Sequence, residues 1–450
     1  MARRVIRGAT VVTPEQVAIQ DIAIVDGLIE AIGGELPAGD EETNGEGLHI
    51  LPAVIDIHVH FNEPGRTEWE GAATGSRAAA AGGAAAYFDM PLNSTPCTVN
   101  AFEFNRKRTA LEASSITDFA LWGGLVPSSL DHMEELVECG VIGFKAFMCD
   151  SGLPEFPHAD YGTLKKGLIQ AAKLGVPIAV HAENHDLTCR LSKEFKSQGR
   201  TSIRDFLESR PVAAEVDAIV QAAELAGEAG AKLHIVHVSS GTGVVAAAEA
   251  RSRGVDVSIE TCGHYLFFTE SDIERLGAIA KCTPPIRDGQ QQEHLWQLIE
   301  SGVIDAVVSD HSPSPMSMKT DDFWNAWGGI AGVQSTLAVM LERGYHGRAL
   351  SLSRIAALTA GWPALRFELG TTGSLQPGYD ANLTIVDLSR TSVLKDSDLQ
   401  QRHKFSPYLG YEFRGTIVET IRRGETIFKD GQITAKTGGK LLRPGGNTNA

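Results

Sequence analysis

Two histidines separated by a single residue, His58 and His60, stand in the apolar run VIDIHVHF. Residues two apart on a β-strand point to the same face, so the two imidazoles would project together. A second pair ends two later apolar runs, because His181 closes PIAVHAE and His237 lies near the end of KLHIVHVS. The HxH spacing alone leaves coincidence open, but four histidines at such places indicate neutral nitrogen ligands for metal ions.

A lysine and an aspartate complete this set. Lys145 lies in GFKAFMC between two phenylalanines, where an ammonium group would be desolvated. One interpretation is that the side chain extends to solvent or pairs with a carboxylate. The other is that burial lowers the pKa of the amine, so that the neutral amine adds carbon dioxide and the resulting carbamate bridges two metal ions. Asp310, in DAVVSDHSP, could cap a helix, but in this company we expect it to bind one metal and act as the general base.

Two further features are assigned structural roles. His234 lies three residues before His237 and, with the opposite strand parity, is expected to face the helices. The stretch from Gly241 to Ala246 matches a GxGxxG/A turn, but it follows the sixth apolar run, whereas a dinucleotide fold carries that turn in its first unit. Close packing of strand and helix explains these glycines. The alternative hypothesis of a nicotinamide-dependent oxidoreductase would be supported by this motif alone.

A repeated pattern of strands and helices must position these residues. Between about residues 51 and 364, eight short apolar runs begin at positions 54, 84, 118, 143, 177, 232, 255 and 305. Amphipathic stretches such as YGTLKKGLIQAAKLG lie between them. This alternation predicts a parallel (β/α)8 TIM-like barrel, whose chemistry is expected at the C-terminal ends of its strands.

Both ends of the chain show short alternating strand patterns with Asp-Gly or Arg-Gly turns, which predict hairpins. We therefore expect an α/β fold with a barrel at residues 51–365 and a small β-sandwich domain made from residues 1–50 and 366–450. The polar stretch from Asn184 to Pro211 is expected to be a long loop, serving as a mobile lid or a contact between subunits.

Composition limits the function classes. The 450 residues exceed what one core of about 250–300 residues accommodates. With 40 basic and 56 acidic residues, the net charge of −16 provides no field that would attract nucleic acid or anionic lipid. Six scattered cysteines without a CxxC pair, and a start that lacks a signal peptide's apolar run, favour a cytoplasmic protein. No nucleic-acid or membrane partner is expected.

On these motifs the sequence resembles the amidohydrolase superfamily, in its cyclic-amidohydrolase branch. The resemblance covers essentially the whole chain and lies in IDIHVHFNEPG, GFKAF, VHAEN, HVSS and SDHSP. It implies one metal ion held by His58, His60 and Asp310, a second held by His181 and His237, and Lys145 as a bridging N6-carboxylysine. It also implies two divalent ions per subunit, zinc or alternatively cobalt, manganese or nickel, and a homo-oligomer, commonly a tetramer.

Within this branch, the segments EPGRTEWEGAATGSRAAAAGG, MPLNSTPCTV, KCTPPIRD and AWGGIAG are most similar to members that hydrolyse allantoin to allantoate in purine catabolism. Asn62 stands where dihydroorotases carry an arginine, and its amide would hydrogen-bond an uncharged ureido group. Asp150 stands where hydantoinases and dihydropyrimidinases typically carry a tyrosine. The resemblance also implies substrate contacts for Thr283 and for His264, beside which Gly263 replaces a proline.

Three alternatives stay open at this point. A hydantoinase or dihydropyrimidinase, or a dihydroorotase-like enzyme, would use the same assembly on another cyclic amide. A non-catalytic scaffold on the same fold is a further class, although such relatives lack the metal ligands that are all present here.

Overall fold

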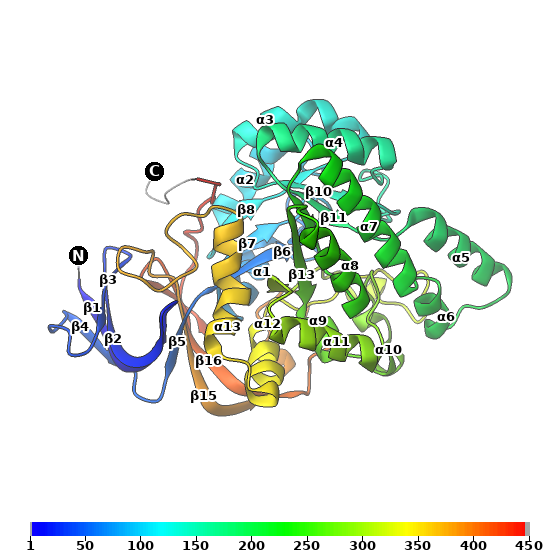
Figure 1. Ribbon diagram of the computed structural model, residues 1–450. Helices are drawn as coiled ribbons and strands as arrows, with labels where there is room; N and C mark the ends of the chain where they lie inside the picture. The colour runs from blue at the N-terminus through cyan, green and yellow to red at the C-terminus, as the bar shows by residue number, and fades with distance from the viewer. Residues whose placement is uncertain (1, 446–450) are drawn as a thin grey trace.

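The computed structural model describes residues 2–445, in which a barrel is joined to a curved sheet built from both ends of the chain (Figure 1). Each of the eight apolar runs contains a barrel strand. The strands are β6 (Val54–Val59), β7 (Ala84–Asp89), β8 (Asp118–Leu121) with its continuation β9 (Gly123–Gly124), β10 (Phe144–Phe147), β11 (Ile178–His181), β12 (Leu233–Ile235), β13 (Val257–Cys262) and β14 (Ala306–Val308).

Neighbouring barrel strands pair in parallel, and the third run pairs with β7 through β8 and with β10 through β9. The ring closes between its first and last strands. There the backbone N–H of His60 donates to the carbonyl of His311 at 2.7 Å, beside a parallel bridge between Val59 and His311. These pairings confirm the predicted barrel.

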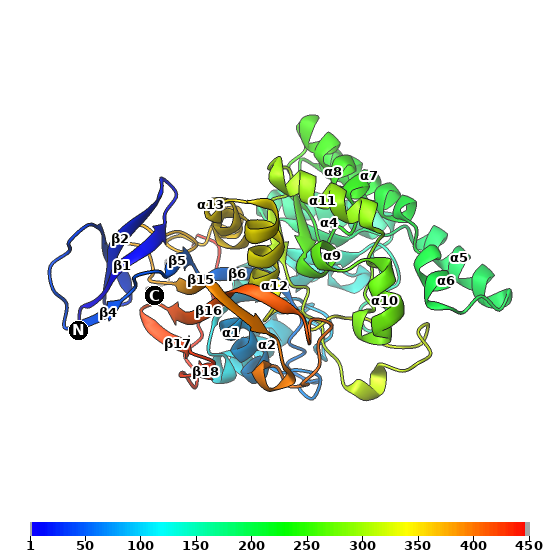
Figure 2. The same ribbon diagram turned by 90° about the horizontal axis from the view of Figure 1, so that it is seen from below.

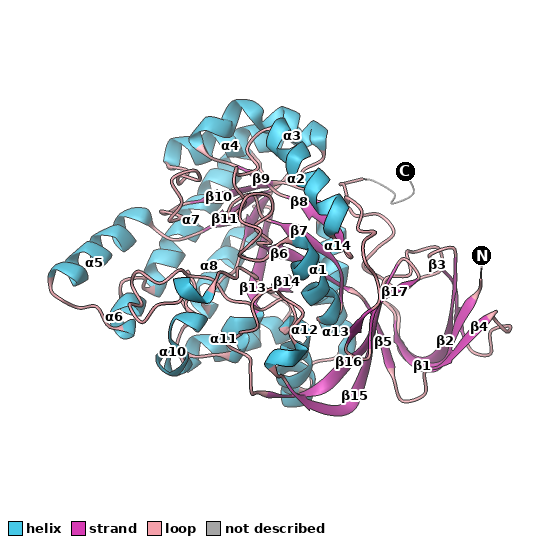
Figure 3. Ribbon diagram, turned by 180° about the vertical axis from the view of Figure 1, so that it is seen from behind, coloured by secondary structure: helices cyan, strands magenta, loops and turns pink. Residues whose placement is uncertain are grey.

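Helices cover the outside of the barrel (Figure 3). The longer ones are α1 (Ala72–Ala81), α2 (Ala101–Ser114), α4 (Tyr161–Leu174), α7 (Val212–Ala229), α8 (Gly241–Ser252) and α11 (Gly289–Glu300). Shorter ones are α3 (Met133–Cys139), α9 (Gly263–Phe267), α10 (Glu270–Leu276), α12 (Thr336–Val339), α13 (Leu352–Ala356) and α14 (Trp362–Arg366).

Helix α4 shows how local sequence sets these elements. The side chain of Asp160 accepts a hydrogen bond from the backbone N–H of Thr163 at 2.8 Å and so caps the first turn. Leu164, Leu168 and neighbouring small residues recur at helical spacing and are buried. The helix ends at Gly175, whose φ of +75° suits a residue without a side chain.

Strands from both ends of the chain form one sheet. They are β1 (Arg4–Val12), β2 (Val17–Val25), β3 (Leu28–Gly33), β4 (Glu41–Asn44), β5 (His49–Pro52), β15 (Leu383–Val393), β16 (Glu412–Arg422), β17 (Glu425–Lys429) and β18 (Gln432–Ile433). Their order is β18-β17-β16-β15-β5-β1-β2-β3, with β4 on β1. The two ends meet where β5 pairs antiparallel with β15. This confirms the predicted fold class.

The segment from Asn184 to Pro211 is helical, so the expectation of a long loop was wrong. It contains α5 (His185–Ser197) and α6 (Ile203–Glu208). Asn184 caps α5 by accepting from the N–H of Leu187 at 2.9 Å, and one buried phenylalanine in each helix anchors this otherwise polar sequence. Figures 1 and 2 show both helices extending from the barrel on the side opposite the terminal sheet.

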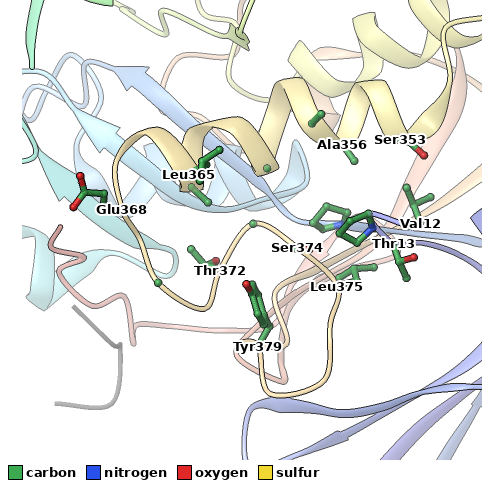
Figure 4. A pocket seen from close by; sticks show the side chains of 17 residues that line it. Val12, Thr13, Ser353, Ala356, Leu365, Glu368, Thr372, Ser374, Leu375 and Tyr379 are labelled. Carbon is green, nitrogen blue, oxygen red and sulfur yellow. The ribbon is translucent and has the colours of Figure 1, made fainter. Parts of the chain in front are cut away.

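A cavity of about 560 Å³ lies where the end of β1 meets α14 and the loop at residues 370–379 (Figure 4). Its walls are mainly apolar or small, with Leu365 and Leu375 among them, and none of the residues predicted to bind metal lines it. Across residues 2–445, every helix is too short or too polar to cross a membrane.

Candidate metal centre and substrate cavity

Three of the predicted metal ligands meet where the barrel closes. His58 lies in β6, His60 follows the end of that strand, and Asp310 follows β14. The Nε2 atoms of both histidines lie 3.4 Å from Oδ1 of Asp310. Asp310 has a φ of +45°, so its backbone departs from strand geometry at this point. The closing strands thus bring one carboxylate and two imidazoles to one place.

The second pair of histidines lies beside this group. His181 is the last residue of β11 and His237 follows β12, and Nδ1 of His181 lies 3.1 Å from Nε2 of His237. The rings of His58 and His237 are 5.2 Å apart between centroids. Ligand atoms of His58, His237 and Asp310 all lie within 4.8 Å of one another, close enough to share a metal ion.

Lys145 lies in β10 and is fully buried. Among the described residues its Nζ atom has no hydrogen-bond partner. Burial lowers the pKa of this amine to about 8, against the opposing effect of the negative charges of Glu260 and Asp310. A buried amine without a partner is costly in a folded protein, so its presence suits a group that is modified or bound when the site is filled.

The electrostatics of the site favour neutral imidazoles and an ionised aspartate. Burial lowers the pKa of His58 and His181, and it lowers the pKa of His237 still further. Burial would raise the pKa of Asp310, but the neighbouring His58 and His60 outweigh it and hold that pKa well below its usual range. These are the protonation states that metal ligation requires.

Glu260 belongs to the site although its sequence context gave no sign of it. This fully buried residue of β13 contacts Nδ1 of His58 through one carboxylate oxygen and lies 3.0 Å from Nε2 of His234 through the other. His234 therefore points into the barrel, and the expectation that it faces the helices was wrong. Side chains alternate between the two faces only along an extended strand, and this alternation does not continue to His237, because β12 ends at Ile235 and His237 has a φ of +39°.

Glu183 holds the second group of ligands in a similar way. Its Oε2 atom lies 2.7 Å from Nε2 of His181 and accepts a hydrogen bond of 2.7 Å from Nη1 of Arg210. Cys149, His181 and Glu183 lie close enough together to form a metal cluster on geometry alone. The guanidinium of Arg210 already neutralises this carboxylate, so the three side chains form part of an ion-pair network.

A cavity of about 490 Å³ opens over these residues. His58, His60, His181, His237 and Asp310 all line it. Its other walls include residues of the predicted substrate loops, among them Asp150, Thr283 and the stretch at 324–329. The chemistry-bearing side chains and an adequate space for a small molecule therefore lie together at the C-terminal ends of the strands, as the barrel architecture leads one to expect.

Asn62 and His264 are buried and are not among the residues that line this cavity. Asn62 has a φ of +63°, a conformation that asparagine tolerates better than most residues. Its Nδ2 lies 3.5 Å from the carbonyl of Pro313, while Oδ1 has no partner within residues 2–445. Substrate contact by either residue stays a prediction.

The glycine-rich turn at residues 241–246 is tightly packed, as expected. A Cβ atom on Gly241 would lie 2.3 Å from the ring of His294, and one on Gly243 would lie 2.9 Å from Oε2 of Glu215. Glu215 itself accepts hydrogen bonds of 2.8 Å from both the backbone N–H and the hydroxyl of Ser239. A carboxylate of the protein thus occupies the start of α8, where a dinucleotide phosphate would bind.

Comparisons with known proteins match residues 49–432 to the amidohydrolase family. The protein from Solibacter usitatus named "Allantoinase" is 60% identical, with 100% of this chain and 99% of that protein covered. One of the same name from Rubrobacter xylanophilus is 49% identical, covering 98% and 97%. Among solved structures, the L-hydantoinase (dihydropyrimidinase) from Arthrobacter aurescens is similar with a TM-score of 0.95 and 31% identity, covering 98% of this chain and 100% of that one.

Proposed function

Because this chain belongs to the amidohydrolase family, we propose that it hydrolyses the cyclic amide of allantoin and releases allantoate. The observation that carries this proposal is the convergence of four imidazoles and Asp310 near Lys145, whose amine is buried without a partner in the described part of the chain. Full-length relatives that bear the name "Allantoinase" support the choice of substrate.

The donor atoms fit two divalent metal ions. One ion would be held by His58, His60 and Asp310, the other by His181 and His237, with N6-carboxylated Lys145 as the bridge. Neutral nitrogen and anionic oxygen ligands suit zinc, and cobalt, manganese or nickel accept the same set. When bound, such ions polarise the scissile carbonyl and lower the pKa of the attacking water.

Asp310 would carry the proton during the reaction. Its carboxylate is ionised, lines the cavity and lies 3.4 Å from Nε2 of both His58 and His60. As the water oxygen bonds to the ring carbonyl carbon, Asp310 accepts a proton, and it returns that proton to the ring nitrogen when the C–N bond breaks. The four imidazoles would stay neutral and hold their positions throughout.

The cavity offers polar groups that suit an uncharged, donor-rich substrate. Asp150 is exposed in the cavity wall, where a carboxylate accepts hydrogen bonds from ureido N–H groups. Thr283 lines the same cavity and offers a hydroxyl group. Asn62 would contribute an amide if a shift of its loop brings the free Oδ1 atom toward the ligand. Together these groups favour allantoin over substrates that carry a carboxylate.

A hydantoinase is the second candidate, because the similar structure from Arthrobacter aurescens bears that name. The two functions separate in one experiment, in which a single metal-loaded preparation is given allantoin, 5-substituted hydantoins, dihydrouracil and dihydroorotate. We expect the highest kcat/KM on allantoin. A higher value on a 5-substituted hydantoin would replace the proposed substrate and leave the ring-opening chemistry unchanged.

A metal assay tests the catalytic assignment against a scaffold role. Protein prepared with zinc and bicarbonate should hold two metal ions per chain, and a content near zero would favour the scaffold. We also expect a homotetramer, as the resemblance implies, and a cytoplasmic location, as the scattered cysteines favour. Light scattering that gives the mass of a single chain would refute the tetramer.

A further inference from the structure

Glu260 contacts the imidazole of one predicted metal ligand, His58, and only the backbone of another, His237. One of its oxygens contacts Nδ1 of His58 and also accepts a hydrogen bond of 3.1 Å from the backbone N–H of His237. Its other oxygen faces Nε2 of His234. A carboxylate that accepts from Nδ1–H of His58 fixes the tautomer of that ring, so the lone pair of Nε2 faces Asp310.

Glu183 makes the corresponding contact to the other group. Its Oε2 atom lies 2.7 Å from Nε2 of His181 and is held by Arg210 at the same distance. The proton on Nε2 of His181 therefore faces the carboxylate, and the lone pair of Nδ1 faces His237. Glu183 is fully buried, as Glu260 is, so neither contact is weakened by water.

The remaining two histidines lack such support. Nδ1 of His60 and Nδ1 of His237 are buried and make no hydrogen bond in the part of the chain that the structure describes. Each predicted metal position thus combines one imidazole that a buried carboxylate orients with one imidazole that is held only by its backbone and packing. The division is symmetrical, with Glu260 serving His58 and Glu183 serving His181.

We propose that Glu260 and Glu183 are positioning residues, each of which sets the affinity of a different one of the two metal ions. This rests on the proposed metal centre and adds to it a separate control of each position. A carboxylate partner increases the basicity of the imidazole and fixes the ring, and its removal elsewhere costs about 10–100-fold in metal affinity. Glu260 governs the ion at His58, His60 and Asp310, and Glu183 governs the ion at His181 and His237.

The test compares three nearly isosteric variants, Glu260→Gln, Glu183→Gln and Glu215→Gln. Glu215 is the matched control, because it is equally buried but bonds to Ser239 and Ser240 at the start of α8. Metal retained per chain is measured during titration with a chelator after loading with cobalt, whose absorption reports the ligand geometry. Each of the first two variants should lose one ion at about 10–100-fold lower chelator concentration than wild type, while Glu215→Gln should retain both ions.

A background with one metal position identifies which ion is lost. In a His181→Ala background, Glu260→Gln should weaken the remaining ion and Glu183→Gln should leave its affinity unchanged. Equal effects of both variants in this background would overturn the assignment. Unchanged chelator curves in the original variants, with a normal circular dichroism spectrum, would overturn the positioning role altogether.

A measurement on the metal-loaded wild type covers the case in which a variant does not fold. Proton NMR should show two strongly deshielded imidazole N–H signals, assigned to Nδ1–H of His58 and Nε2–H of His181; their absence would refute both contacts. The results that would refute the positioning role differ from those that would refute the proposed function. Wild type that holds two ions but leaves allantoin intact refutes the function alone, and unchanged metal affinity in the variants refutes the positioning role alone.

Discussion

Removal of metal and carbon dioxide, followed by their return at different pH values, tests the proposed modification of Lys145. Only the neutral amine can attack carbon dioxide; the N–C bond forms and one proton leaves as the carbamate appears. The buried amine has a pKa of about 8 because desolvation disfavours its charged form. The rate of reactivation should therefore follow the neutral fraction of this one side chain.

The expected size of the effect comes from that pKa. With a pKa of about 8, about 10% of the amine is neutral at pH 7 and about 90% at pH 9. A lysine with the ordinary pKa of about 10.5 would be about 0.03% neutral at pH 7, some 300-fold less. The rate should rise about tenfold for each pH unit below 8 and become constant above about 9.

The assay uses stripped protein, a fixed concentration of dissolved carbon dioxide and excess zinc, with allantoin hydrolysis as the readout. Carbon-13-labelled carbon dioxide gives an independent NMR signal for the carbamate. Lys145→Ala should give neither the signal nor activity. A rate that keeps rising tenfold per unit to pH 10, or full activity regained without carbon dioxide, would refute the reasoning.

Three other substitutions give defined results. Metal-free Lys145→Met should be more stable than metal-free wild type by up to about 3 kcal/mol at pH 7, because the lowered pKa of Lys145 means that its charged form opposes folding below pH 8. Urea unfolding should show this gain in stability shrinking between pH 8 and 10.5, and equal stability of the two proteins at pH 7 would contradict the prediction. Asp310→Asn should lower kcat by about 10²–10⁴-fold, and a loss under tenfold with both ions still bound would exclude it as the base. Asp150→Tyr should lower kcat/KM for allantoin by about tenfold and favour 5-substituted hydantoins, whereas an unchanged ratio of the two activities would remove Asp150 from the specificity pocket.

The barrel, and the meeting of the predicted ligands at one end of it, could be predicted from sequence because their signals are local. A short apolar run that contains or is followed by histidine or aspartate is visible in a short window, and a barrel brings the ends of such runs to one rim. The helices between Asn184 and Pro211 were missed because their surfaces are mainly polar, so the caps and two buried phenylalanines were the only signals.

Glu260 and Glu183 could not be assigned in the same way. The contact between Glu260 and His58 joins residues 202 positions apart in the sequence, and only the closed barrel brings them together. The error at His234 has a different cause, because strand parity holds only while the backbone stays extended. The positive φ of His237 breaks that alternation, and no residue type in HIVHVS marks the break.

The pairing of β5 with β15 has a consequence for how the chain is made. Residues 49–52 contact residues 383–386, so during synthesis β5 leaves the ribosome more than three hundred residues before its partner. Only Ala53 separates β5 from β6, which carries His58. The strand that begins the barrel is thus attached to a sheet edge that stays open until the last part of the chain arrives, and shortening the chain before residue 383 would leave that edge free to bind other strands.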